Sequence, residues 1–282
     1  MRNGECGMRR EERCANARAG TTHHAQSAIR SAFREGTADG CGVLLIHGLT
    51  ASPTEVQPIA DFLGQSDPTL TISSPLLPGH GTTPEALRGT DPATWSRCVA
   101  DEIERLATRR GGVIVVGVSM GAVLAAEGTI RDPRVRGLVM LAPVFGIGGI
   151  RGLALPLLKH VKPFVRKSRA SVENHRAKGL FSYDRYAVTS LLQLRELGRR
   201  VRPALHRVAV PTLLAAGRRD RYVPWRSVER LRSELLANRQ TGFRLEFVEC
   251  PRSGHVLPHE PDSANLLLAI GGFVAALDER SP

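Results

Sequence analysis

The stretch VIVVGVSMGAVLAA, residues 113–126, changes character once along its length. It begins as a run of β-branched apolar residues, passes through Gly-x-Ser-x-Gly at 117–121, and continues with small, helix-forming residues. A short apolar run bounded by glycine is typical of a buried strand, and the alanine-rich run after it is typical of a helix. The stretch therefore predicts a strand that turns sharply into a helix, with Ser119 at the turn.

The same alternation continues on both sides of this stretch. Further apolar runs predict strands at 43–46, 69–73, 137–142, 211–217 and 244–249, and helical patterns lie near 53–65, 92–110, 120–131, 225–238 and 261–278. Strands that are apolar throughout and separated by helices are typical of a parallel sheet covered on both faces. We therefore predict an α/β fold with a mostly parallel, doubly wound sheet and helices on both faces.

One interval is too long for a simple connection between strands. Almost seventy residues separate the run ending at 142 from the run starting at 211. Connections inside compact domains are usually much shorter. We predict a core made of residues 28–145 and 196–282, with an insertion at 146–195 that we call the cap. Residues 1–27 are polar, arginine-rich and aperiodic, which predicts a disordered extension.

The cap carries a concentration of positive charge. The chain has a net charge of +12, and residues 151–178 contain eight lysines or arginines against one acid, Glu173. Apolar residues follow helical spacing within it, which predicts a basic amphipathic helix kinked at Pro163: Leu157, Leu158, Val161, Phe164 and Val165. Its basic face has two readings, a solvated surface over an ordinary lid or a surface that docks on anionic lipid. A basic chain also raises nucleic acid as a partner, but no nucleic-acid-binding signature is present, so we expect none.

The cysteines and the N-terminus bear on disulfides, metal sites and cellular location. The five cysteines are scattered without a CxxC pair: Cys6, Cys14, Cys41, Cys98 and Cys250. Neither a disulfide framework nor a metal site is expected from this pattern. The charged N-terminus has no apolar segment behind it, and no stretch is long enough to span a membrane. We expect a soluble, cytoplasmic protein, with peripheral membrane contact as the alternative linked to the cap.

Ser119 lies in the pattern of a nucleophile elbow, the strand-to-helix turn of α/β-hydrolases. Gly117 and Gly121 are needed there because side chains would clash with the neighbouring strand and helix. A serine hydroxyl needs a base, and the base needs an orienting acid. This fold places them in the chain order Ser, then Asp or Glu, then His, each after a strand. Asp220 follows the predicted strand 211–217, and His255 follows 244–249.

The roles follow from this order. Ser119 attacks, His255 takes and returns the proton, and Asp220 fixes the imidazole tautomer. Each position has a weaker competitor in the sequence. His259 lies four residues beyond His255 but reads as the approach to the last helix. Asp184 and Glu249 are alternative acids, one within the cap and the other within a strand.

The negative charge that forms during acyl transfer needs two backbone donors. The N–H of Met120, after the nucleophile, is expected to be one of them, and Leu49 in the loop HGLTASPTEV (47–56) the other. Gly48 lets this loop turn in closely. We expect His47 and His80 to brace their loops rather than to act as bases.

These segments together resemble a known family. VLLIHGLTASPTEV, PLLPGHGTTPEAL, DPATWSRCVADEI, GVSMGA, SLLQL and GRRDRYVP resemble the bacterial monoacylglycerol lipases and the small carboxylesterases related to them, over about residues 40–278. The resemblance implies an α/β-hydrolase fold with a small cap, no cofactor, and hydrolysis of a small-molecule carboxylic ester. By position, Ser119, Asp220 and His255 match the catalytic triad of that family, and Leu49 and Met120 match its oxyanion pair.

The sequence also departs from the family. Leu49 stands where a phenylalanine is usual, and Ala122 replaces a common glycine after the elbow. The cap aligns poorly before SLLQL (190–194). Monoacylglycerol and short or medium-chain acyl esters are therefore both expected substrates. A thioesterase or other acyl hydrolase using the same triad is the alternative, followed by a non-catalytic binding protein on this fold.

Overall fold

The computed structural model describes residues 31–109, 112–147, 155–159 and 161–278 of the chain. The extension predicted at 1–27 lies outside the described residues. The central sheet has seven strands in the order β1-β3-β2-β4-β5-β8-β9. Their bounds are β1 (Ala32–Arg34), β2 (Gly42–Ile46), β3 (Thr71–Ser74), β4 (Val113–Val118), β5 (Val135–Leu141), β8 (Thr212–Gly217) and β9 (Leu245–Cys250).

Neighbouring strands from β3 to β9 pair in parallel, and only β1 is antiparallel, at the edge beside β3. The mostly parallel sheet is confirmed, and each strand expected from the sequence is present. The short strand β1 was not predicted, because AFR offers no apolar run. The carboxyl ends of β4, β8 and β9 consequently meet at one edge of the sheet, where ligands bind in this architecture.

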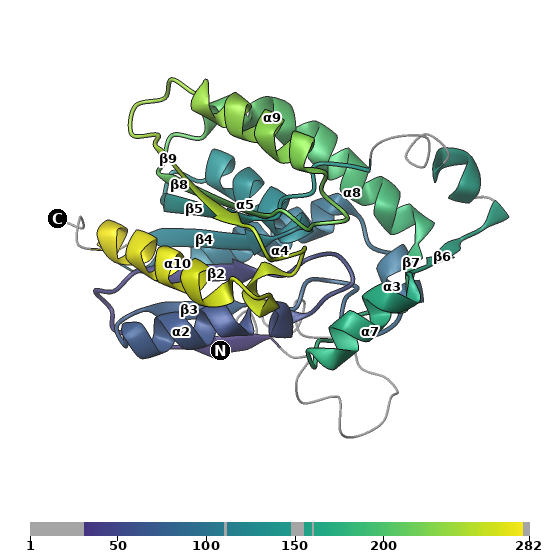
Figure 1. Cartoon of the computed structure of the whole chain (residues 1–282). Coiled ribbons are helices and arrows are strands. Elements are labelled where there is room, and N and C mark those ends of the chain that lie inside the picture. Colours follow the sequence, from purple (N-terminus) through teal and green to yellow (C-terminus); the bar gives the residue numbers. More distant parts are fainter. Residues whose placement is uncertain (1–30, 110–111, 148–154, 160, 279–282) are drawn as a thin grey trace, which may run out of the picture.

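Helices cover both faces of the sheet (Figure 1). One face carries α2 (Gln57–Ser66) and α10 (Ser263–Asp278), and the other carries α4 (Pro92–Leu106), α5 (Met120–Arg131), α8 (Val188–Val201) and α9 (Trp225–Leu236). Successive strand residues alternate between the two layers: Leu44 and Ile46 pack with α4 and α5, whereas Val43 and Leu45 pack with α2 and α10. Because every residue of β2 is buried, its sequence is apolar without a break.

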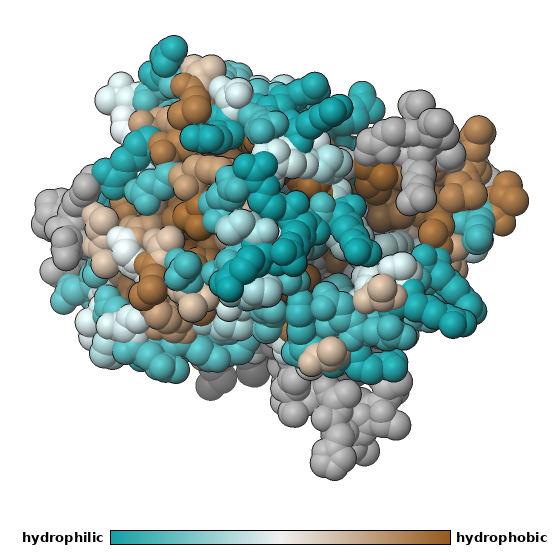
Figure 2. Space-filling model, in the orientation of Figure 1, coloured by the Kyte–Doolittle hydropathy of each residue, from teal (hydrophilic) through white to brown (hydrophobic). Residues whose placement is uncertain are grey.

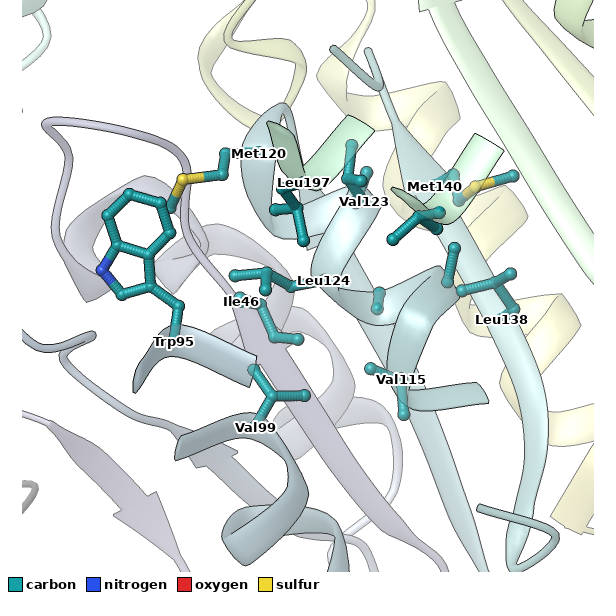
Figure 3. Close-up of a cluster of buried hydrophobic side chains, with 14 of the residues drawn as sticks. Ile46, Trp95, Val99, Val115, Met120, Val123, Leu124, Leu138, Met140 and Leu197 are labelled. Carbon is teal, nitrogen blue, oxygen red and sulfur yellow. The ribbon is translucent and has the colours of Figure 1, made fainter. Parts of the chain in front are cut away.

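The core behind the elbow joins α5 to its neighbours. In Figure 3 the side chain of Met120 extends toward the indole of Trp95, and Val123, Leu124 and Leu197 complete the layer. Trp95 is fully buried, and its Nε1 donates to the Pro78 carbonyl at 3.0 Å. The first residue of α5 is therefore fixed by packing as well as by its backbone.

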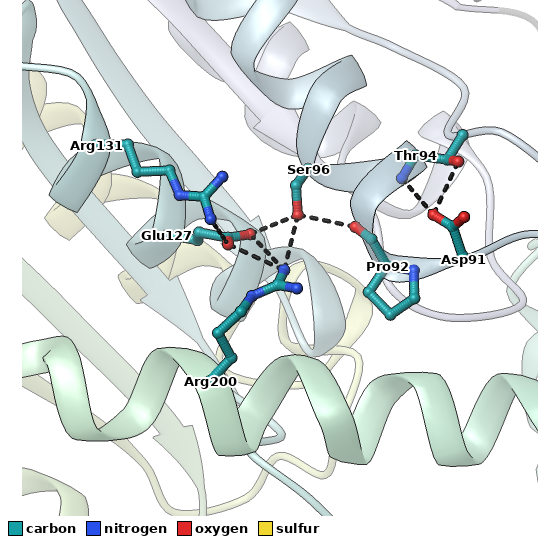
Figure 4. Close-up of polar contacts among 7 residues, drawn as sticks. All are labelled: Asp91, Pro92, Thr94, Ser96, Glu127, Arg131 and Arg200. Carbon is teal, nitrogen blue, oxygen red and sulfur yellow. Dashed lines mark hydrogen bonds and ion pairs between the residues drawn. The ribbon is translucent and has the colours of Figure 1, made fainter.

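A buried carboxylate connects three helices on this face (Figure 4). Glu127 of α5 pairs with Arg131 at 2.9 Å and with Arg200 of α8 at 3.0 Å, and Ser96 Oγ of α4 lies 2.6 Å from its Oε2. Only 6% of the Glu127 side chain is exposed. Removing one member of such a group leaves a buried charge without compensation. Glu127 therefore ties α8 to the helix that begins at the elbow.

The described part of the cap contains a two-stranded antiparallel sheet and a short helix. They are β6 (Phe164–Arg166), β7 (Arg185–Ala187) and α7 (Arg169–Ala177). α8 begins directly after β7 and crosses the expected boundary at 195/196 as one continuous helix. Smaller elements connect the core: α3 (Pro84–Arg88), η2 (Pro53–Glu55), η3 (Arg202–Arg207) and η4 (Leu257–His259).

The amphipathic helix expected through Val165 is wrong in its second half. Residues 155–159 are helical, but Phe164 and Val165 lie in strand β6. Proline at 163 removes a backbone donor and disfavours helix in the residue before it, so the chain extends there. The expected apolar face is also exposed to solvent, at 77% for Leu157 and 85% for Val161. Among the described residues, no helix is long and apolar enough to cross a membrane.

Candidate active site

Ser119 lies at the turn between β4 and α5 in a backbone conformation that side chains rarely adopt, with φ 57° and ψ −114°. Such a conformation costs about 1–3 kcal/mol and persists only where the surroundings enforce it. A Cβ at Gly117 would lie 2.1 Å from the Gly121 carbonyl oxygen, and a Cβ at Gly121 would lie 2.1 Å from the carbonyl oxygen of Ile46. Both contacts are with backbone, so the sharp turn requires glycine at each position.

The structure brings Ser119, His255 and Asp220 together. His255 Nε2 lies 2.9 Å from Ser119 Oγ, and its Nδ1 lies 2.7 Å from Asp220 Oδ2. An ionised carboxylate only accepts, so Nδ1 carries the proton and Nε2 is free to accept from the serine hydroxyl. A histidine held in this way can take the hydroxyl proton while its imidazolium is stabilised by the carboxylate.

Asp220 is itself fixed in place. Its side chain is 2% exposed, and its Oδ1 accepts the backbone N–H of Tyr222 at 2.7 Å and of Val223 at 3.0 Å. The Tyr222 ring lies 4.9 Å from the His255 ring, centroid to centroid. The loop after β8 therefore holds both the carboxylate and one side of the imidazole.

The two expected oxyanion donors belong to peptide groups whose carbonyl ends are anchored. The Leu49 N–H shares a peptide group with the Gly48 carbonyl, which accepts from His47 Nδ1 at 2.9 Å and from the Ala51 N–H at 3.2 Å. The Met120 N–H shares a peptide group with the Ser119 carbonyl, which accepts the Val144 N–H at 3.3 Å. In a planar trans peptide the N–H points opposite to the carbonyl, so these bonds fix the direction of both donors.

Glu55 is a supporting residue that the sequence reasoning missed. Its Oε2 accepts the Gly48 N–H at 2.6 Å, and the residue is 5% exposed. Burial raises the pKa of this carboxyl. The only sequence signal was an acidic residue inside an otherwise apolar and small-residue loop entering a helix.

The imidazoles of His47 and His80 brace loops, as expected. His47 Nε2 accepts the Leu77 N–H at 3.1 Å while Nδ1 donates to Gly48, so the ring is neutral and joins the loops after β2 and β3. Burial lowers the pKa of His47 to about 4 and that of His80 well below its usual range. His80 Nδ1 donates to the Pro78 carbonyl at 3.2 Å.

The competing residues lie in other contacts. His259 Nε2 donates to the Thr54 and Glu55 carbonyls at 3.1 and 3.2 Å, which ties η4 to η2. Glu249 pairs with Arg218 on the surface of β9. Asp184 accepts the Lys167 N–H through its backbone carbonyl, next to β7.

The cap reaches the site through side chains that the sequence did not single out. Lys167 Nζ donates to Thr50 Oγ1 at 2.6 Å, next to Leu49, and to Ser182 Oγ at 2.5 Å. Burial lowers the pKa of Lys167 to about 8. Ser171 Oγ of α7 lies 2.6 Å from Tyr222 Oη, and Lys178 Nζ lies 2.5 Å from Glu260 Oε1. These contacts link the cap to the loops after β2 and β8 and to the end of η4.

The described ranges contain no group of three or more histidine, cysteine, aspartate or glutamate side chains that could hold a metal ion.

A strand-to-helix elbow with a serine, followed by an aspartate and a histidine after later strands, defines the class of α/β-hydrolase folds. A model of the Alpha/beta hydrolase family matches residues 43–268, and the chain belongs to this family.

Individual relatives agree with this assignment. Over 188 residues the chain is 29% identical to a thermostable monoacylglycerol lipase from Bacillus sp. (strain H-257), covering 65% of this chain and 72% of that protein. A structure from the pair of metagenome-derived lipolytic enzymes LipS and LipT matches with a TM-score of 0.76 and 21% identity, covering 88% of this chain and 98% of the other. The monoacylglycerol lipase of Paleococcus ferrophilus matches with a TM-score of 0.69 and 15% identity, covering 88% and 98%. At these identities the two structures show a shared fold.

Proposed function

We propose that this chain is a carboxylic ester hydrolase that forms an acyl-enzyme on Ser119. The observation that carries the proposal is the continuous hydrogen-bond chain from Ser119 Oγ through the His255 imidazole to the Asp220 carboxylate. The relative from Bacillus sp., a monoacylglycerol lipase, supports an ester as the substrate.

The reaction proceeds in two halves. Ser119 Oγ attacks the ester carbonyl carbon as its proton passes to His255 Nε2, and the resulting oxyanion accepts the N–H groups of Leu49 and Met120. Collapse breaks the bond to the alcohol, which leaves with the proton from His255. Water then attacks the acyl-enzyme, with His255 as base, and the carboxylic acid is released.

The expected substrate is a monoacylglycerol or another short or medium-chain acyl ester. Such a molecule has one ester and an apolar chain, and the apolar side chain of Leu49, which is only partly buried beside the expected oxyanion donor, suits it. A thioester presents the same acyl carbonyl to Ser119, so it belongs in the substrate panel as the competing class.

The test is hydrolysis of p-nitrophenyl esters of increasing chain length, monoacylglycerols and acyl thioesters by the purified chain. We expect Ser119→Ala to lower turnover by about 10⁴-fold or more. Ser233→Ala, at an exposed position of α9, is the matched control and should keep full activity. A fluorophosphonate probe should label the unaltered chain and the control but not Ser119→Ala. Retained turnover in Ser119→Ala would refute the mechanism, and faster thioester cleavage would reassign the substrate.

We also propose that the end of the cap makes peripheral contact with anionic lipid. Leu157 and Val161 are exposed, and Lys159 and Lys162 lie beside them in the sequence. Figure 2 shows hydrophobic surface at the end of the cap that projects farthest from the sheet. Apolar side chains flanked by lysines are typical of interfacial segments.

Sedimentation with vesicles tests the lipid contact separately from catalysis. The chain should bind vesicles containing phosphatidylglycerol more strongly than neutral vesicles, and Leu157→Ser with Val161→Ser should reduce this binding. Leu236→Ser, which removes an exposed leucine from α9, is the control. Equal binding to neutral vesicles, or none, would refute the contact.

A further inference from the structure

A pocket of about 340 Å³ opens between α8 and α9, next to the loop that follows β5. This volume lies at the small end of the range for ligand pockets. Apolar side chains form much of its lining, from three separate segments: Val144, Phe145, Val223, Val228 and Leu231. Val228 and Leu231 belong to the buried face of α9, which packs against the core of the protein.

The other wall is basic. Arg195 and Arg199 of α8 and Arg202 of η3 also line the pocket, and none of its described lining residues is acidic. Residues four apart on a helix share a face, so Arg195 and Arg199 project toward the same side. Arg202 is paired with Glu234 at 2.9 Å. Among the described residues, none accepts a hydrogen bond from Arg199.

The pocket is distinct from the candidate active site but shares a wall with it. Ser119, Asp220 and His255 do not line it, whereas Tyr222 and Val223 do. These two residues donate their N–H groups to Asp220, and the Tyr222 ring lies against His255. A molecule in this pocket would therefore contact the loop that positions the triad.

We propose that this pocket binds an amphipathic anion, an alkyl chain that ends in a carboxylate or a phosphate group. Apolar side chains take up the chain, and the guanidinium groups bind the planar or tetrahedral anion through paired hydrogen bonds. A carboxylic acid released by ester cleavage is one source of such a ligand and a phosphorylated lipid fragment is another. The binding site itself does not depend on the proposed hydrolysis.

Calorimetric titration of the Ser119→Ala protein tests the pocket without turnover. The ligands share one chain: decanoate, decyl phosphate, decanol and decyltrimethylammonium, each below its micelle concentration. We expect decanoate or decyl phosphate to bind about tenfold more tightly than decanol, because a hydrogen bond to a charged group contributes more than one to a neutral group. Which of the two anions binds more tightly identifies the source. Similar affinity for all four ligands would overturn the proposal.

Variants assign the binding to this pocket rather than to the active site. In the Ser119→Ala background, Arg195→Gln with Arg199→Gln should remove the preference for the anions and leave decanol binding unchanged. Ser227→Trp fills the pocket from an exposed position of α9 and should abolish binding of all ligands that enter it. Arg230→Gln, on α9 outside the lining, is the matched charge control. Decanoate binding unaffected by both pocket changes, in proteins with unaltered melting temperature, would overturn the proposal.

Discussion

The elbow and the cap are held in place by different kinds of contact. Around Ser119 the decisive contacts are between backbone atoms, and a single added methyl group at Gly117 or Gly121 would overlap a carbonyl group. In the cap, α7 buries none of its residues, and the core contacts the side-chain ends of its Ser171 and of Lys178, the residue after the helix. Substitutions at the elbow should thus lower activity toward every substrate, whereas substitutions in the cap should change the relative activities toward different substrates.

The largest effect on stability and activity is expected at Gly121, where the elbow has no space for a side chain. Gly121→Ala would place a Cβ 2.1 Å from the Ile46 carbonyl oxygen, and neither helix nor strand can move away cheaply. We expect a loss of about 3 kcal/mol in the free energy of unfolding, with loss of all esterase activity. Chemical denaturation measures the stability change.

Gly272→Ala in α10 is the matched control, because a Cβ there meets nothing within 4 Å. It should stabilise the protein by about 0.5–1 kcal/mol, since alanine favours helix over glycine. Equal changes in the free energy of unfolding for Gly121→Ala and Gly272→Ala would show that the elbow is no more tightly packed than the exposed face of α10.

Asp220→Asn keeps the shape of the side chain and can replace the acceptor Oδ2 with an amide N–H donor. The amide can donate to His255 Nδ1 and so favours the tautomer whose Nε2 cannot accept the serine proton. We expect kcat to fall by about 10⁴-fold for every ester, short or long. Asp132→Asn is the control, because Asp132 pairs with Arg134 at the opposite end of α5 from Ser119. A loss confined to some substrates would contradict the placement of Asp220 in the chemistry.

Glu55→Ala tests the loop at 47–56, which carries the proposed oxyanion donor Leu49. Without its carboxylate the Gly48 N–H loses a buried acceptor at 2.6 Å, and the direction of the Leu49 N–H is less well fixed. We expect kcat to fall by about 10²-fold with little change in KM, as for loss of one oxyanion donor. Glu55→Gln retains an acceptor and should recover part of the rate. A change in KM alone would indicate substrate binding instead.

A change in the cap should be smaller and selective. Lys167→Met removes the hydrogen bonds to Thr50 and Ser182 and loosens the cap above the oxyanion loop. We expect about a tenfold loss in kcat/KM for medium-chain esters and a smaller loss for acetate esters, which need fewer cap contacts. Lys167→Arg keeps the positive charge and should recover part of the lost kcat/KM. A uniform loss across the panel would place Lys167 with the elbow rather than with the cap.

The last effect appears only at acidic pH. Burial lowers the pKa of His47 to about 4, whereas an exposed histidine of the unfolded chain titrates near about 6.5. Between these values the unfolded chain binds more protons than the folded chain, so the free energy of unfolding decreases as pH falls from about 6.5 to about 4. His47→Gln should reduce this decrease, measured by denaturation at several pH values. An unchanged pH profile in His47→Gln would show that the buried imidazole does not cause the decrease in the free energy of unfolding.

The sequence predicted the core better than the cap, for physical reasons. Strands such as β4 are buried on both faces, so their apolar runs are unambiguous, and α5 begins and ends at the expected residues 120 and 131. Ser119 and Asp220 each follow such a strand, and His255 follows β9, a partly buried strand at the edge of the sheet that was also predicted. Glu55 and Lys167 could not be selected from the sequence. Their roles arise from contacts with the loop at 48–50 in the folded chain, and no local sequence pattern predicts those contacts. In the cap, helical spacing at 157–165 was overridden by Pro163 and by the pairing of β6 with β7.

The continuity of α8 determines where this enzyme can be cut and rejoined. The helix starts beside the cap sheet yet carries Arg200, which balances the carboxylate of the helix that begins at the nucleophile. A chimera that borrows a relative's cap should therefore be joined after β5, at 143–147, and again ahead of Val188, rather than within the helix. Grafts designed on these borders would exchange the cap while preserving Arg200, the charge partner of Glu127 in the host's own α5.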